Sequence, residues 1–265
     1  MAELRSHATL NYAAEGPVAR AVFARPQLGN SLSEEALDDI GDVLRSVQAN
    51  GTVRALILSG EGDAFCAGLD DELLERVYAD AEFFEHVLTR LAATCFSLES
   101  LEVPVIAKVR GLAVGAGLEL AMACDVIIAT DDAQLGDGHL AAGVVPGAGA
   151  SIRLARLVGV PRARELIYSG RTISGAQAAS IGLVLSAVAD DELDRATDAL
   201  VASFADKPRH ALATAKRQIN RGLGLDPTSG VEQERRELIR YMREAGADAL
   251  EGLHARREDR PPVWR

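Results

Sequence analysis

The amino-acid sequence predicts a layered α/β fold that ends in a helical C-terminal part. Strand-like apolar runs alternate with segments in which apolar residues recur at helical spacing, and this alternation is typical of layered α/β folds. From Asp190 onward the pattern is mostly helical. The length of 265 residues suits one large domain, or one domain with a small appendage.

The first half of the chain carries the clearest element signals. Residues 18–23 predict a strand, and Ser31 and Glu34 have the spacing of a capping box, which marks the start of a helix. The apolar residues of that helix recur at helical period: Ala36, Leu37, Ile40, Val43, Leu44 and Val47. Further strands are predicted over 53–58, 105–109 and 126–129, and further helices over about 80–98 and from residue 116.

The second half is punctuated by proline and glycine. Pro161 predicts the first turn of a helix, where its missing N–H is no loss. Residues 183–188 predict a late strand. Lys207-Pro208 and the segment 222–224 divide the helical C-terminal part into pieces.

Composition and charge exclude several classes of function. The net charge of −11 argues against nucleic-acid binding, which needs a basic surface. No apolar run is long enough to span a membrane, and the polar start Met1–Arg5 does not resemble a signal peptide. The cysteines Cys66, Cys95 and Cys124 are an odd number without metal-ligand spacing, so we expect buried, reduced, structural thiols and no metal site, in a cytoplasmic protein.

The segment 111–125 is the most informative part of the chain. It places three glycines between a strand-like run and an Ala/Leu/Met-rich helix, and such a turn leaves backbone N–H groups free to bind an anion or an oxyanion. Glu119 lies three residues after Ala116 and therefore shares a helix face with the turn. A catalytic role and a purely structural role, in which the glycines allow close packing and Glu119 suits the helix dipole, are equally supported by this segment alone.

A second segment, 64–70 (AFCAGLD), favours the catalytic role of segment 111–125. Together the two segments resemble the enoyl-CoA hydratase/isomerase family, also called the crotonase superfamily, except that Ala116 replaces the middle glycine of a triplet. Segments 25–32, 143–149 and 251–262 resemble further motifs of the same family, in the same order.

The resemblance implies an overall organisation. It implies a spiral of repeated β-β-α units over residues 1–196, which would bind acyl-CoA and carry the catalysis, and a helical trimerisation region over residues 197–265. The expected assembly is a homotrimer or a hexamer of two stacked trimers. No separate cofactor is implied, because CoA enters as part of the thioester substrate.

The resemblance also implies site residues. The backbone N–H groups of Leu69 and Ala116 would form the oxyanion hole for a thioester enolate, and Glu119 takes the place of a catalytic glutamate. His139 stands where the hydratases carry their second glutamate, so a Glu–His pair would perform the acid–base work. Asp137 is out of register for that role, and we expect it to stabilise a turn.

CoA itself is expected along the first motifs. The resemblance places the nucleotide beside Arg25, Gln27 and Leu28, and gives the Ala67 carbonyl to the adenine. The remaining predicted contacts to CoA or substrate are Gly68 and Asp70.

Three functions remain open at this point. The first is hydration or isomerisation of an enoyl-CoA through a thioester enolate. The second is hydrolysis of a carbon–carbon bond in a β-diketone, as in members of the superfamily with a histidine at the place of His139, although the aspartate that pairs with it there is Ala148 here. The third is an acyl-CoA-binding protein with little activity.

Overall fold

The fold is built on a large, seven-stranded sheet. The computed structural model describes residues 3–246 and 248–264. The strand order of the large sheet is β1-β2-β3-β4-β6-β8-β11, and the strands from β3 to β11 pair in parallel. Its strands are β1 (Glu3–Ser6), β2 (Leu10–Glu15), β3 (Val18–Phe23), β4 (Ala55–Gly60), β6 (Val105–Val109), β8 (Val126–Thr130) and β11 (Ser186–Val188).

A second, small sheet has the order β10-β9-β7-β5. Its strands are β5 (Ala64–Cys66), β7 (Leu112–Val114), β9 (Gln134–Gly136) and β10 (Ile173–Ser174). The pairs β4/β5, β6/β7 and β8/β9 each give one strand to each sheet and then lead into a helix. The predicted spiral of β-β-α units is therefore confirmed.

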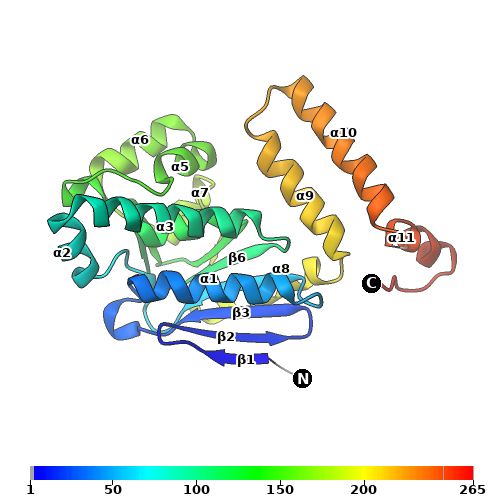
Figure 1. Cartoon of the computed structure of the whole chain (residues 1–265), viewed down its shortest axis with the longest axis horizontal. Helices are drawn as coiled ribbons and strands as arrows, with labels where there is room; N and C mark the ends of the chain where they lie inside the picture. The colour runs from blue at the N-terminus through cyan, green and yellow to red at the C-terminus, as the bar shows by residue number, and fades with distance from the viewer. Residues whose placement is uncertain (1–2, 247, 265) are drawn as a thin grey trace.

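Helices cover both faces of the large sheet (Figure 1). In β4 the alternate residues Ala55 and Ile57 pack toward α8, while Leu56 and Leu58 pack on the opposite face, as the period of two in a strand requires. The helices of the core are α1 (Glu34–Ala49), α2 (Asp71–Ala79), α3 (Ala81–Ser100), α4 (Ala116–Ala123), α5 (Ala150–Val158), α6 (Val160–Ser169), α7 (Gly175–Ser180) and α8 (Leu193–Ala205), with short 3-10 turns at η1 (Pro26–Leu28), η2 (Leu140–Ala142) and η3 (Asp190–Glu192).

The C-terminal helices α9 (Arg209–Gly222), α10 (Pro227–Glu244) and α11 (Asp248–Arg257) follow. Figure 1 shows α9 and α10 side by side as a hairpin that extends away from the core. The buried Lys216 attaches α9 to the core: its Nζ donates to the Leu98 carbonyl at 2.8 Å and to Asp125 Oδ2 at 2.7 Å. The predicted division between residues 196 and 197 lies inside α8, which packs on the sheet, and it stays a prediction.

Most predicted elements are confirmed, and one helix start is wrong. The strands predicted over 18–23 and 105–109 have those bounds, and the late strand is shorter, at 186–188. Helix α1 is capped by Ser33, whose Oγ accepts from the Ala36 amide at 3.1 Å, and not by Ser31. Leu32 forms a β-bridge with Leu69, which keeps the chain extended there and delays the helix to Glu34. In the described ranges no helix is both long and apolar enough to cross a membrane.

Candidate active site

One cavity of about 220 Å³ brings the predicted catalytic residues together. It lies between the turn after β5, the N-terminus of α4 and the loop after β9. Leu69, Ala116, Glu119 and His139 all line it. Residues separated by up to 70 positions in the sequence therefore share one site.

Glycines set the spacing between the turn and the helix. A Cβ atom on Gly117 would lie 2.1 Å from the Cys66 carbonyl oxygen, so only glycine lets α4 approach β5 this closely. Gly68 has a φ of +107°, and a Cβ atom there would lie 4.0 Å from the Ala116 nitrogen. The turn and the start of α4 are consequently in direct proximity at the cavity.

The amides of Leu69 and Ala116 are free to bind a ligand. Among the residues with described structure, no backbone acceptor takes up either N–H group. Ala116 is the first residue of α4, where an N–H has no partner within the helix. Its φ is not in the left-handed region, so alanine in place of glycine imposes no backbone strain.

Glu119 is a buried carboxylate with one oxygen fixed and one open. Its Oε1 accepts hydrogen bonds from the Ala148 amide at 2.9 Å and from the Ala150 amide at 3.0 Å, and the residue is 1% exposed. Burial raises the pKa of Glu119, and the Ala150 amide and the charge of His139 oppose that rise only in part. The other oxygen, Oε2, lies 4.0 Å from His139 Nε2.

His139 is held between two carboxylates. Its Nδ1 lies 3.0 Å from Asp137 Oδ1, while Nε2 faces Glu119. Burial lowers the pKa of His139, but the hydrogen bond and charge of Asp137 and the charge of Glu119 outweigh it, so the pKa lies above its ordinary value. The imidazole is therefore suited to carry a proton near neutral pH.

The prediction for Asp137 was incomplete. The expected turn is present, because Asp137 Oδ2 lies 3.4 Å from the His139 amide. The same carboxylate, which is 0% exposed, also contacts the His139 ring. The turn brings side chains two positions apart to one side, and the Asp-Gly-His spacing was the signal that could have revealed this contact.

Arg153 on α5 also belongs to the site's framework, and no sequence pattern predicts its role. This buried side chain donates to the Ala148 carbonyl through Nη1 and to Glu99 Oε1 through Nε at 2.7 Å. It thereby fixes the loop whose amides hold Glu119. The donors from that loop are backbone groups, which residue type does not reveal.

The predicted nucleotide-binding residues lie apart from the catalytic cavity. Arg25, Gln27 and Asp70 line a polar cavity of about 430 Å³. The Arg25 guanidinium contacts Asp70 Oδ2 at 3.2 Å, so its charge is already shared with a carboxylate. Leu28 is 47% exposed on η1. Ala67 and Gly68, by contrast, line the cavity that holds Glu119 and His139.

The rest of the catalytic cavity is apolar. Its wall beyond the polar groups is formed by α2, α3 and the loop before α5. The apolar side chains are Leu74, Val77, Tyr78, Phe84, Leu88, Leu91, Ala142, Val144 and Val145. A ligand held here would place a polar centre at the amides and an apolar part between α2 and α3.

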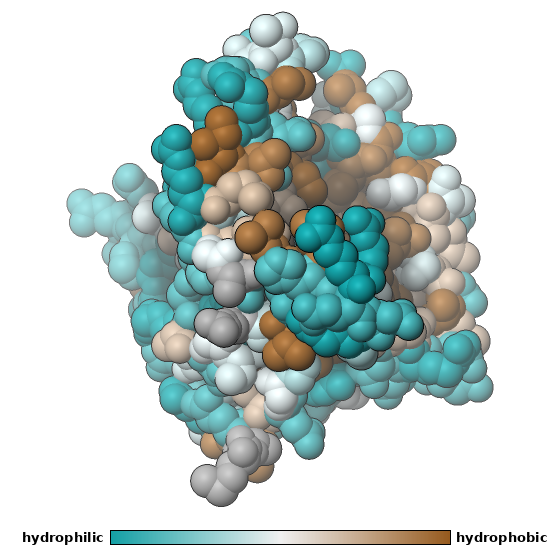
Figure 2. All heavy atoms as spheres, turned by 90° about the vertical axis from the view of Figure 1, so that its right-hand side faces the viewer, coloured by the Kyte–Doolittle hydropathy of each residue, from teal (hydrophilic) through white to brown (hydrophobic). Residues whose placement is uncertain are grey.

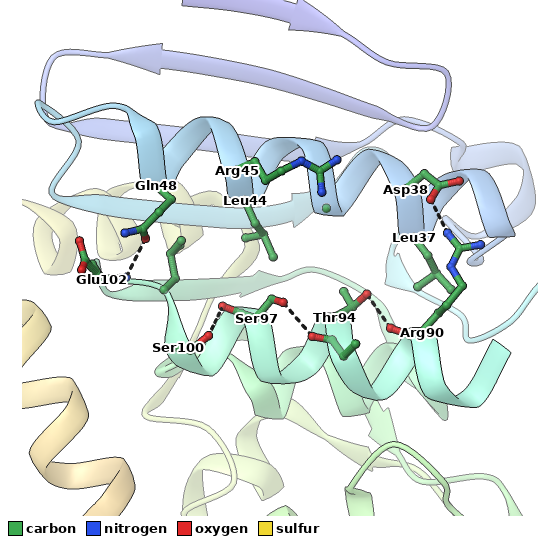
Figure 3. A pocket seen from close by; sticks show the side chains of 13 residues that line it. Leu37, Asp38, Leu44, Arg45, Gln48, Arg90, Thr94, Ser97, Ser100 and Glu102 are labelled. Atoms are coloured by element: carbon green, nitrogen blue, oxygen red, sulfur yellow. Dashed lines mark hydrogen bonds and ion pairs between the residues drawn. The ribbon is translucent and has the colours of Figure 1, made fainter. Parts of the chain in front are cut away.

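A larger groove of about 510 Å³ lies between α1 and α3, away from these residues (Figure 3). Its Thr94 and Ser97 hydroxyls donate to carbonyls of their own helix, and Arg90 is paired with Asp38. None of the predicted site residues lines it. Size alone therefore does not identify the active site.

The cysteines are buried with free thiols, as predicted. Burial raises the pKa of the Cys66 and Cys95 thiols to about 12 and raises that of Cys124 as well. Protonated thiols are poor nucleophiles, so these three cysteines are not suited to act as nucleophiles.

Comparisons with known proteins identify the family of the chain. The enoyl-CoA hydratase/isomerase family model matches residues 13–265. A Bacillus subtilis protein described as an enoyl-CoA hydratase/isomerase is 37% identical over 242 residues, which are 91% of this chain and 92% of the relative. Rat mitochondrial methylglutaconyl-CoA hydratase is 33% identical over 242 residues, covering 89% of this chain and 75% of the relative. The crystal structure of an enoyl-CoA hydratase from Bacillus anthracis superposes with a TM-score of 0.90 at 34% identity, covering 99% of this chain and 98% of that chain.

Proposed function

The chain belongs to the enoyl-CoA hydratase/isomerase family, and we propose that this acyl-CoA-processing enzyme hydrates a 2-enoyl-CoA, or isomerises its double bond, through a thioester enolate. The observation that carries the proposal is the arrangement of Glu119. Its Oε2 faces His139 Nε2 in the cavity that the free amides of Leu69 and Ala116 also line.

The two amides would stabilise the charge that forms on the thioester oxygen. They are held in place by the backbone, so they need no rearrangement when the enolate forms. Losing one such donor typically lowers kcat by about 100- to 1,000-fold. The acyl chain would lie between α2 and α3 against apolar side chains, and the CoA nucleotide would extend toward Arg25, Gln27, Leu28 and Asp70.

The Glu–His pair would carry both protons of a hydration. Glu119 takes a proton from water as the water oxygen bonds to Cβ, and the electron pair of the double bond moves through Cα to the thioester oxygen. The His139 imidazolium then donates its Nε2 proton to Cα, and the enolate returns to a thioester. The 4.0 Å between the two side-chain atoms leaves them free to contact a shared water or substrate.

A binding and turnover experiment tests this function. Calorimetry is expected to show binding of acetyl-CoA or a longer acyl-CoA but not of the free acids, and crotonyl-CoA is expected to be hydrated. Failure to bind any CoA thioester across chain lengths would remove the proposal. Binding without turnover of crotonyl-CoA or its isomers would favour an acyl-CoA-binding protein with little activity.

The pairing of Glu119 as base with His139 as acid leads us to expect a bell-shaped pH profile of kcat/KM. Glu119 must be ionised to act as base, and its raised pKa places the acidic limb above the ordinary value of 4.5. His139 must be protonated to act as acid, and its raised pKa places the alkaline limb above the ordinary value of 6.5. Activity is therefore lost as the pH rises through the alkaline limb. Because Glu119 and His139 interact, the two limbs report apparent pKa values of the pair and not of either residue alone.

His139→Gln is expected to remove the alkaline limb, and His139→Glu would restore a two-carboxylate pair. The measurement is kcat/KM from pH 4 to 10 for each variant. An unchanged profile and rate in His139→Gln would leave Glu119 as the sole acid–base group.

One observation favours a second function, the hydrolysis of a carbon–carbon bond in a β-diketone. That chemistry pairs a histidine with a carboxylate. Ala148, at the place of the pairing aspartate, has no carboxylate, but Asp137 has one and contacts His139 with it. Loss of the ultraviolet absorbance of a cyclic β-diketone on incubation with the enzyme would support this function over hydration.

The C-terminal helices support an oligomer. Val231, Leu238, Ile239 and Met242 on α10 are exposed, and so is Ile219 on α9. Figure 2, which faces this end of the molecule, shows hydrophobic patches among the hydrophilic side chains. We propose that residues 197–265 mediate a homotrimer, or a hexamer of two trimers, which light scattering after size exclusion would test. Three free thiols favour a cytoplasmic location.

A further inference from the structure

We propose that Asp137 is a positioning residue that fixes the tautomer and the charge of the His139 imidazole, and so determines that Nε2 is the nitrogen that exchanges a proton at the active site. The proposal rests on the proposed function only in giving His139 a part in turnover. The contact itself is a property of the resting protein.

The geometry ties Asp137 to His139 and to little else. The carboxylate is 0% exposed, with Oδ1 3.0 Å from His139 Nδ1 and Oδ2 3.4 Å from the His139 amide. In the part of the chain that the structure describes, these are the hydrogen bonds seen at its side chain. A buried carboxylate is costly unless it is paired, so the fold retains this one together with the imidazole.

The tautomer follows from the donor and acceptor chemistry. An ionised carboxylate only accepts hydrogen bonds, so Nδ1 must carry a proton. Nε2 is then the nitrogen that gains or loses the second proton, and it faces Glu119 Oε2 at 4.0 Å. Backbone near Gly115 approaches the same nitrogen, because a Cβ atom on Gly115 would lie 4.0 Å from Nε2. This backbone adds no charge.

The charged groups that face the imidazole are both acidic. Within the described residues they are Asp137, from the loop after β9, and Glu119, from α4. Glu119 would be the reaction partner, whereas Asp137 lies on the far side of the ring from it. Removal of the Asp137 charge should therefore weaken proton binding at Nε2 without removing either proposed acid–base group.

The first test measures His139 directly in the resting protein. Proton and nitrogen NMR follow the five histidines through a pH titration, and His139→Gln assigns the resonance that disappears. Asp137→Asn is expected to lower the His139 midpoint by about one pH unit or more, a tenfold weaker proton affinity. The matched control Asp132→Asn, at an exposed position just before β9, is expected to leave it unchanged. An unchanged midpoint in folded Asp137→Asn overturns the proposal.

The second test uses turnover of a confirmed substrate. Replacing the carboxylate that orients a catalytic histidine lowers kcat by up to about 10,000-fold in serine proteases. Here we expect a loss of about 10- to 1,000-fold in Asp137→Asn and a shift of the alkaline limb to lower pH. The double variant Asp137→Asn/His139→Gln should be no slower than His139→Gln alone, because Asp137 acts through the imidazole.

The two tests separate the possible failures. Additive losses in the double variant would show a structural role and overturn the proposal. If the wild type turns over no acyl-CoA, the proposed function fails, while the NMR titration still decides the role of Asp137. Asp137→Ser gives the same comparison if Asp137→Asn does not fold.

Discussion

Glu119→Gln is expected to lower kcat on a confirmed acyl-CoA substrate by about 100- to 10,000-fold while leaving the affinity for the CoA thioester nearly unchanged. Glutamine keeps the shape of the side chain and can still accept the Ala148 and Ala150 amides through one oxygen. It cannot take a proton from water at the position that faces His139. The loss corresponds to about 3 to 5 kcal/mol of transition-state stabilisation.

The measurement combines steady-state kinetics with calorimetry on the same preparation. Glu85→Gln, at an exposed position on α3, is the matched control and should behave as the wild type. The fold of Glu119→Gln should be preserved, because the substitution removes a buried charge whose pKa is already raised by burial. A variant with wild-type kcat would place the base elsewhere in the cavity.

Sequence patterns predicted five of the seven strands of the large sheet, because these five are apolar runs or alternate clearly, whereas the more polar β1 and β2 were not predicted. Strand β3 has six residues that alternate clearly between buried and more exposed, and β6 has five residues that are nearly all buried. The small sheet was not predicted from periodicity, since β5, β7 and β9 have three residues each and lie inside Gly-rich segments. Runs this short give no measurable period.

The prediction of the candidate site rested on the family resemblance more than on local patterns. Motifs around Leu69 and Ala116 identified the loops, and the structure places their amides on one cavity with Glu119 and His139. What the sequence missed depends on side-chain direction and on backbone groups. The contact of Asp137 with the imidazole and the amides from residues 148 and 150 arise only once the loops are folded.

The residues predicted to border the CoA nucleotide show a different limit of sequence-based prediction. The resemblance placed Arg25 beside the CoA nucleotide, but the structure pairs its guanidinium with Asp70, a residue that also caps α2. A sequence pattern assigns residues to a site one at a time. It does not show that two of them neutralise each other before a ligand arrives.

Gly117→Ala is expected to damage both stability and catalysis, because the added methyl group has no space. Its Cβ atom would lie 2.1 Å from the Cys66 carbonyl oxygen and 2.8 Å from the Cys66 carbonyl carbon, which are backbone atoms. Overpacking of this kind costs about 1 to 3 kcal/mol, which lowers Tm by several degrees in a domain of this size. Helix α4 must move away from β5, and the Ala116 amide moves with it.

The effect on catalysis should exceed the effect on folding. Measured well below Tm, kcat is expected to fall by at least about tenfold, toward the 100- to 1,000-fold that loss of one oxyanion donor costs. The matched control is Gly41→Ala in α1, where a Cβ atom would meet only the end of the Arg45 side chain at 3.4 Å. Alanine in that helix should be neutral or stabilising by up to about 1 kcal/mol. If Gly117→Ala retained wild-type kcat with a lowered Tm, the distance between α4 and β5 would matter for the fold alone, and the amide of Ala116 would not be the donor that the thioester oxygen needs.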